Sequence, residues 1–124
     1  KKQKRWAVNN SGGSRRRMMK EILYNKLVRD KIPQIIEEAG KQYETKILSD
    51  MEYLEMLDKK LDEELAEYHR DKNLEELADL LEVLYAAASA RGYSIEELEQ
   101  SRIKKRETRG GFEKKILLTK VIED

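Results

Sequence analysis

Acidic side chains gather between residues 60 and 82, and their spacing is suited to holding a metal ion. Glu64 and Glu67 are three positions apart, as are Glu76 and Asp79, so each pair lies on one face of its helix. The short connection at residues 71–73 predicts an antiparallel hairpin in which the two pairs meet. Carboxylates gathered in this way repel one another. A hard divalent cation with oxygen ligands, Mg²⁺ or alternatively Mn²⁺, relieves that repulsion.

A second interpretation is that these acids form the solvated faces of two amphipathic helices, since Glu is a good helix former. Position on the helical wheel argues against it for part of the set. Glu64 lies beside Leu61 and Leu65, and Glu76 lies beside Leu77, so both border an apolar stripe. The pattern alone leaves both interpretations open.

Basic side chains dominate the C-terminal part of the chain, and Lys26, Arg29 and Lys31 add to them near the N-terminal end. The C-terminal set is Arg102, Lys104, Lys105, Arg106, Arg109, Lys114, Lys115 and Lys120. Arg and Lys bind phosphate oxygens, and Gly110-Gly111 would let backbone N–H groups approach the same anion. The alternative is compensation of a helix dipole. Acids, cations and a divalent metal in one domain would serve phosphoanhydride chemistry.

The composition limits the remaining classes of function. The chain has 124 residues, 41% of them charged, with one Pro and no Cys, which favours one small helical domain. The lack of Cys excludes a thiolate metal site, a Cys nucleophile and a disulfide scaffold. His69 is the only histidine, which excludes a histidine-based triad or zinc cluster. So small a core favours self-association as a homodimer or homotetramer.

Residues 1–17 form a basic leader with seven Lys or Arg residues and no acid. The leader contains the linker-like run Asn9-Asn10-Ser11-Gly12-Gly13-Ser14, so a flexible tail is favoured over a nucleic-acid-binding arm. Met18-Met19 follows it, and we expect the native start there, with residues 1–17 as added or upstream sequence. Residues 18–124 then form the single domain. The sequence contains no run of 18 apolar residues, so it predicts no membrane span. We expect a cytoplasmic protein.

Apolar periodicity and helix caps predict an all-α antiparallel bundle with four main helices. They span residues 31–39, 50–70, 74–91 and 95–108. The predicted N-terminal caps are Asp30, Ser49, Asn73 and Ser94. Apolar stripes on the second and third helices face each other across the hairpin. Residues 42–48 and 112–122 have the composition of short strands, so we expect at most a small two-stranded element.

The acidic pattern resembles the signature of the MazG-like, all-α nucleoside triphosphate pyrophosphohydrolase superfamily. The residues that carry it are Glu63-Glu64-Leu65-Ala66-Glu67 and Glu76-Leu77-Ala78-Asp79. The segments Tyr24-Asn25-Lys26-Leu27-Val28-Arg29-Asp30-Lys31-Ile32-Pro33 and Arg109-Gly110-Gly111-Phe112 are similar to its phosphoribosyl-ATP pyrophosphohydrolase-like subgroup.

The resemblance implies a Mg²⁺-dependent enzyme that cleaves a nucleotide between its α and β phosphates. The metal ligands would be Glu64, Glu67, Glu76 and Asp79, with Glu82 as an additional acid. Glu63 would orient or deprotonate the attacking water. The phosphates would be bound by Lys105, Arg106, Arg109, Asn25, Lys26 and Arg29. A second protomer would complete the helical bundle.

Three hypotheses for the function follow. The first is a pyrophosphohydrolase that removes non-standard or excess nucleotides. The second is a phosphoribosyl-ATP pyrophosphohydrolase of histidine biosynthesis, which would use the same metal chemistry. The third is a non-catalytic helical interaction module whose basic leader binds nucleic acid. Pyrophosphate release would separate the first two from the third.

Overall fold

The chain folds into helices, and the computed structural model describes residues 20–124. The helices are α2 (Ile32–Glu38), α3 (Asp50–Asp71), α4 (Leu74–Ala90) and α5 (Ile95–Arg109). No strand forms within residues 20–124. The all-α prediction is therefore confirmed, and each helix lies close to its predicted range. The basic leader, residues 1–17, lies outside the described residues.

Side-chain caps fix the starts of the three long helices. The Ser49 hydroxyl accepts a hydrogen bond from the Glu52 N–H, and the Glu52 carboxylate accepts one from the Ser49 N–H. Ser94 and Glu97 form the same reciprocal capping box at α5. The Asn73 side chain accepts from a backbone N–H in the first turn of α4. These caps satisfy donors that a helix start leaves without a partner, as the sequence predicts.

The cap predicted for the first helix is wrong. Asp30 does not cap α2; the N-cap position is Lys31, whose side chain makes no capping hydrogen bond. Lys31 already has near-helical backbone angles (φ −90°, ψ −2°), whereas a side-chain cap requires an extended residue. Pro33 lies in the first turn, where its missing N–H leaves no bond unmade.

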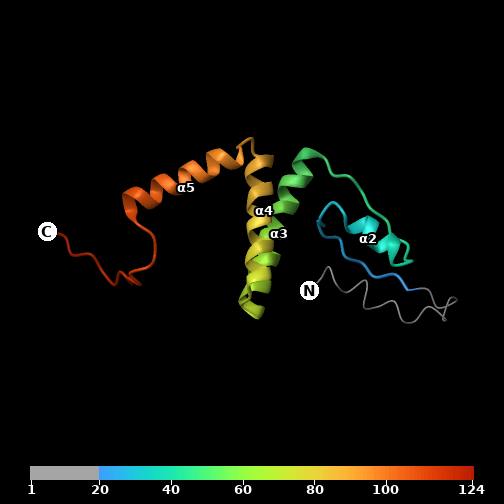
Figure 1. Ribbon diagram of the computed structural model, residues 1–124, viewed down its shortest axis with the longest axis horizontal. Helices are drawn as coiled ribbons and strands as arrows, with labels where there is room; N and C mark the ends of the chain where they lie inside the picture. The colour runs from blue at the N-terminus through green and yellow to red at the C-terminus, as the bar shows by residue number, and fades with distance from the viewer. Residues whose placement is uncertain (1–19) are drawn as a thin grey trace.

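Residues 42–48 and 112–122 have no strand structure, which agrees with the expectation of at most a small two-stranded element. Figure 1 shows the reason: residues 42–48 lead into α3 on one side of the molecule, while residues 112–122 follow α5 on the other. An isolated strand has no partner for its backbone hydrogen bonds, so neither segment is stable in that form.

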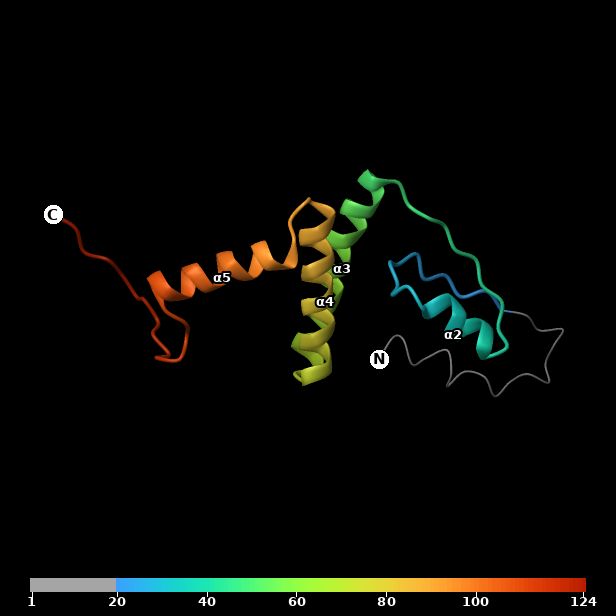
Figure 2. The same cartoon turned by 45° about the horizontal axis from the view of Figure 1, so that its top comes forward.

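Helices α3 and α4 form an antiparallel hairpin, which lies at the centre of the molecule in both Figure 1 and Figure 2. Lys72, with φ +54°, turns the chain between them. The buried apolar side chains are Leu57 of α3, Val83 of α4 and Ile32 of α2. The hairpin was predicted, but its apolar core is small.

The buried face of the hairpin coincides only in part with the predicted leucine stripes. Leu57 and Val83 are buried there, but so are the carboxylates of Glu64, Glu67 and Glu76. Five leucines of the predicted stripes are exposed to solvent by 43–80%: Leu65, Leu74, Leu77, Leu81 and Leu84. One chain therefore covers only part of the two stripes, and acids lie where the helices meet.

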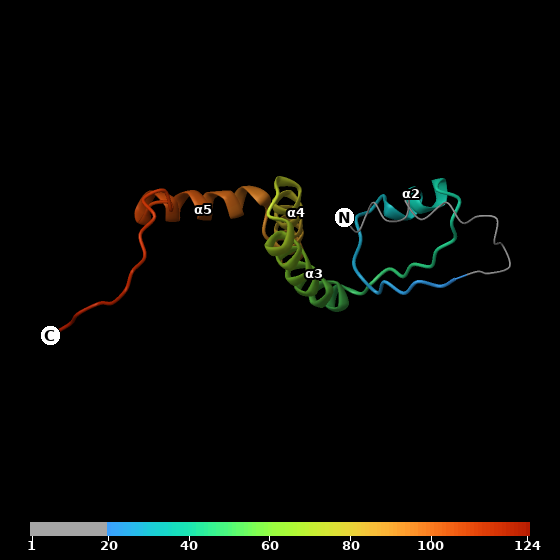
Figure 3. The same ribbon diagram turned by 90° about the horizontal axis from the view of Figure 1, so that it is seen from below.

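Helix α5 runs away from the hairpin, as Figures 1 and 3 both show. Gly92, with φ +92°, lies in the turn that redirects the chain after α4. None of the α5 residues is buried. Its side chains are mostly charged, so α5 has little apolar surface with which to pack on α4. No helix in the described part of the chain is long and apolar enough to cross a membrane.

Candidate metal centre

Three carboxylates from the two hairpin helices meet at one point. Glu64 of α3 and Glu76 and Asp79 of α4 each place a carboxylate oxygen within 4.8 Å of the others. Helix geometry explains this, because Glu76 and Asp79 share one face of α4 and that face packs on α3. The sequence predicted this meeting of the two helices.

The cluster is shielded from solvent. Glu76 is 0% exposed and Glu64 is 4% exposed, while Asp79 lies at the edge of the hairpin. Lys60, one turn before Glu64, provides positive charge. Its Nζ lies 3.4 Å from Glu64 Oε2 and 3.5 Å from Glu63 Oε1. Burial of carboxylates is costly unless a cation neutralises them, so the cluster is suited to binding positive charge.

A second cation reaches the cluster from residues 20–31, which we call the leading segment. Arg29 Nη2 lies 2.7 Å from Asp79 Oδ1, a charge-assisted hydrogen bond. The backbone around Arg29 forms a turn, since its carbonyl accepts from the Ile32 N–H at 3.0 Å. Ile32 is buried. The Arg29–Asp79 ion pair thus links the leading segment to the hairpin, next to the buried start of α2.

A cavity of about 450 Å³ opens beside the cluster. The leading segment forms one wall and the two hairpin helices form the other. The lining residues are Leu27, Val28, Arg29, Asp30, Lys31, Tyr53, Leu57, Lys60, Glu64, Asp79, Glu82, Val83 and Ala86. One part of the cavity wall is therefore charged, with acids and three cations (Arg29, Lys31 and Lys60), and the other part is apolar. A volume of this order is typical of small-molecule sites.

The structure places the other predicted acids at different depths. Glu67 is buried on α3 but is not one of the three residues whose oxygens lie within 4.8 Å. Glu63 is on the same helix, at 27% exposure, and its carboxylate pairs with Lys60. Glu82 lines the cavity, one turn after Asp79. Three of the four predicted metal ligands are therefore brought together, and Glu67 remains a prediction.

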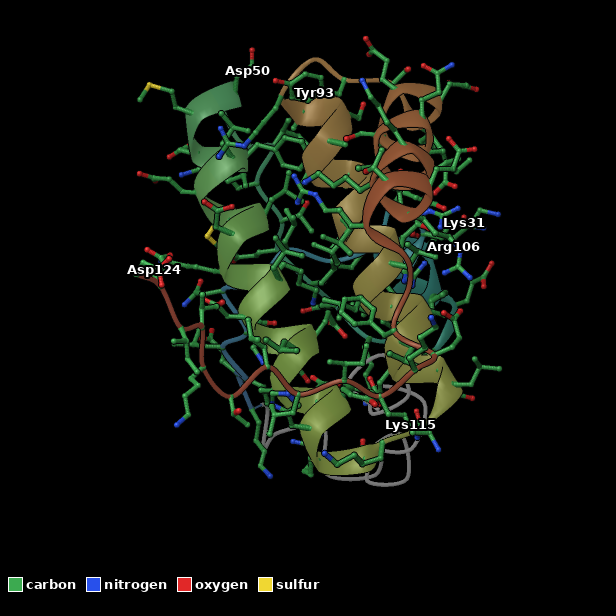
Figure 4. All side chains as sticks on the ribbon, turned by 90° about the vertical axis from the view of Figure 1, so that its left-hand side faces the viewer. Lys31, Asp50, Tyr93, Arg106, Lys115 and Asp124 are labelled. Atoms are coloured by element: carbon green, nitrogen blue, oxygen red, sulfur yellow. The ribbon has the colours of Figure 1, made fainter. Side chains whose placement is uncertain are left out.

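The predicted phosphate-binding residues of α5 do not reach the cavity within one chain. Lys105, Arg106 and Arg109 are exposed on α5 and do not line it. Figure 4 shows Arg106 pointing outward from α5. The reason is the turn at Gly92, which directs α5 away from the hairpin.

Arg106 also has a partner of its own. Its Nη2 lies 2.7 Å from Glu113 Oε2, and this hydrogen bond holds the pKa of the Glu113 carboxyl below its usual value. The pair lies over Gly111, where a Cβ atom would meet the side chains of both residues. The ion pair therefore covers Gly111, whereas the space beside Gly110 is open.

Near the N-terminal end, Arg29 alone of the predicted phosphate ligands lines the cavity. Asn25 and Lys26 lie just outside it, and Asn25 has a left-handed backbone (φ +45°). Lys31, which the sequence grouped with the N-terminal cations, also lines the cavity, whereas sequence reasoning missed Lys60. The spacing of Lys60 to Glu63 and Glu64, three and four positions, was a signal that could have identified it.

The donor set fits a hard divalent cation. All three groups are carboxylates, which Mg²⁺ and Mn²⁺ prefer. The oxygens of Glu64, Glu76 and Asp79 lie within 4.8 Å of one another, so one cation placed between them would be within reach of all three carboxylates after side-chain adjustment.

Comparison of the chain with protein-family models, curated proteins and solved structures finds no match.

Proposed function

We propose that this chain is a Mg²⁺-dependent nucleotide pyrophosphohydrolase that converts a nucleoside triphosphate and water to a nucleoside monophosphate and pyrophosphate. The observation that carries the proposal is the cluster of Glu64, Glu76 and Asp79 beside a cavity that is partly lined by cations. The resemblance of the acidic segments to MazG-like enzymes points to the same reaction. A role in removing non-standard or excess nucleotides follows from that resemblance.

Each part of the cavity has a task in this proposal. Glu64, Glu76 and Asp79 hold the cation, with Glu67 as a further predicted ligand. A divalent cation bound there would stabilise the negative charge that develops on the phosphates during cleavage. Lys60 and Arg29 bind phosphate oxygens on the side of the cavity next to the cluster.

Two further groups complete the proposed site. Glu63 orients or deprotonates the attacking water, and its carboxylate is partly exposed beside Lys60. The apolar part of the cavity, formed by Leu57, Val83 and Ala86, accommodates the non-phosphate portion of the nucleotide.

A nucleotide panel that includes phosphoribosyl-ATP, assayed for pyrophosphate and for orthophosphate with Mg²⁺, tests the proposal. Pyrophosphate must appear, and both Glu64→Gln and Asp79→Asn must abolish it while the helical circular dichroism is retained. Asp62→Asn, a neutralised acid on the exposed part of α3, is the matched control and should keep full activity. Full activity in Glu64→Gln or Asp79→Asn would exclude the cluster as the active site.

We also propose that the chain works as a homo-oligomer. Leu77, Leu81 and Leu84 form an apolar row on α4 that no other part of the described chain buries, each 43–45% exposed. Rows of this kind mark interaction surfaces. A second copy packed there would bury the row, and its α5 cations could then approach the first copy's cavity.

Light scattering on the full chain tests the oligomer. The wild type should have at least twice the monomer mass, and Leu81→Glu should shift it toward the monomer because a buried carboxylate opposes the interface. Ile47→Glu, at a 94% exposed position away from the row, should leave the mass unchanged. A wild-type monomer at high micromolar concentration would refute the proposal.

A further inference from the structure

The Arg29–Asp79 ion pair links the candidate metal centre to the cavity wall. Asp79 is one of the three clustered carboxylates, and its Oδ1 accepts the 2.7 Å hydrogen bond from Arg29. Asp79 is therefore the ion-pair partner of the Arg29 guanidinium and also a candidate ligand of the divalent cation. A guanidinium and a divalent cation that share it repel each other.

Arg29 is also free to move without disturbing the hairpin. The leading segment has no helix or strand, and the Arg29 side chain is 44% exposed. The anchor of this segment is Ile32, which is buried at the start of α2, three positions after Arg29. A shift of Arg29 thus requires rearrangement of a turn, not of α3 or α4.

The cavity offers Arg29 an alternative partner. Arg29 already lines the cavity, together with Lys31 and Lys60. An anionic ligand between these three side chains would be bound by cations from both walls, and a guanidinium binds phosphate oxygens through two parallel hydrogen bonds.

We infer that Arg29 and the divalent cation compete for Asp79, so that cation binding releases the leading segment and makes Arg29 available to a phosphate group in the cavity. This inference rests on the proposed function, because it requires a cation at the cluster. It makes Arg29 a positioning residue that orders binding: the cation comes first and the anionic ligand second. Competition is reciprocal, so the ion pair must weaken cation binding as much as the cation weakens the ion pair.

Mn²⁺ titration of the full chain in the absence of nucleotide, followed by electron paramagnetic resonance, tests the competition. Arg29→Gln should bind Mn²⁺ about two- to fivefold more tightly than the wild type, the effect expected for loss of a partly exposed ion pair. Arg91→Gln is the matched control. It breaks another Arg–Asp pair, with Asp58 at 3.9 Å, away from the cluster, and should leave the affinity unchanged at physiological salt.

Hydrogen exchange on the wild type provides the second measurement and does not depend on the folding of a variant. Mn²⁺ alone should raise the exchange of the Ile32 amide severalfold, because its hydrogen bond to the Arg29 carbonyl closes the turn, while it protects α3 and α4. Loss of the Arg29 charge also makes the surroundings of the cluster more negative, and this alone would raise Mn²⁺ affinity in Arg29→Gln. It would not cause Mn²⁺ to raise amide exchange in the wild type.

The outcomes separate the two proposals. If the wild type binds Mn²⁺ but Arg29→Gln binds it equally or more weakly, or if exchange of the Ile32 amide does not rise, the competition is refuted and the metal centre stands. If the wild type does not bind Mn²⁺ at the cluster, both proposals fail.

Discussion

Replacement of Glu76 by Gln should stabilise the chain in the absence of metal and abolish its stabilisation by Mg²⁺. Glu76 is the most deeply buried acid of the cluster, at 0% exposure, and its oxygens lie near those of Glu64 and Asp79. Glu76→Gln keeps the shape of the side chain and removes its charge. The substitution therefore removes the repulsion between Glu76 and the carboxylates of Glu64 and Asp79.

The magnitude follows from the spacing of the oxygens. At the 4.8 Å limit, two unit charges repel by roughly 3–4 kcal/mol at an effective dielectric constant of about 20. Glu76 has two such neighbours, but Lys60 and Arg29 offset part of the repulsion. We therefore expect a net gain of about 1–3 kcal/mol in the free energy of unfolding. That gain raises the melting temperature by at least about 4 °C.

Thermal melts at pH 8, in EDTA and in excess Mg²⁺, provide the assay. A cation at a hundred times its dissociation constant stabilises the wild type by about 2.7 kcal/mol, and this increment should vanish in Glu76→Gln. Glu75→Gln, the exposed neighbour on α4, is the matched control and should change stability by less than about 0.5 kcal/mol. If Glu76→Gln lowers the melting temperature in EDTA and retains the Mg²⁺ increment, the buried carboxylate has a structural role and our reasoning is wrong.

Two further predictions concern the phosphate-binding cations and the helix caps. If the second copy of the proposed oligomer brings its α5 to the cavity, Arg109→Ala should raise KM for triphosphate about ten- to a hundredfold, the loss of one charge-assisted contact. Arg109→Lys should recover only part of it because Lys lacks the bidentate fork. An unchanged KM with a lower melting temperature would assign Arg109 to compensation of the α5 dipole. The backbone N–H of Ser49, with Lys46 nearby, holds the pKa of Glu52 below its usual value. That stabilisation is present above the unfolded pKa and lost as the pH falls through the folded one, so the difference in melting temperature between wild type and Glu52→Gln should shrink below about pH 4; a difference independent of pH would contradict it.

Local signals in the sequence were sufficient to locate the helices. The boxes Ser49–Glu52 and Ser94–Glu97 and the cap at Asn73 depend on residues three positions apart, so no distant contact is needed to form them. The strands depend on pairing between distant segments. Residues 42–48 and 112–122 have suitable composition, but α5 carries the second segment away from the first. Composition contains no information about that separation.

The leucine pattern predicted only in part which residues of the hairpin are buried. A stripe of leucines normally marks the face that packs on a neighbour. Here Leu57, Lys60 and Glu64 follow one another at helical spacing along the inner face of α3, while Leu65 is half exposed. The leucine pattern therefore predicted burial that one chain does not provide. This mismatch is the physical reason to propose a second copy on the exposed row of α4.

The two halves of the predicted site differ in how far their positions depend on the rest of the fold. The acids lie on helices joined by only two residues, so the meeting of Glu64 with Glu76 and Asp79 follows from helix geometry once the hairpin forms. The α5 cations follow a turn whose direction is set by the backbone at Gly92, and no spacing rule fixes that direction. The cations found at the cavity, Lys60 and Arg29, are instead bound to the acids themselves. A search for phosphate ligands should therefore begin with the cations that already neutralise the metal cluster, because these must find new partners when a divalent ion arrives.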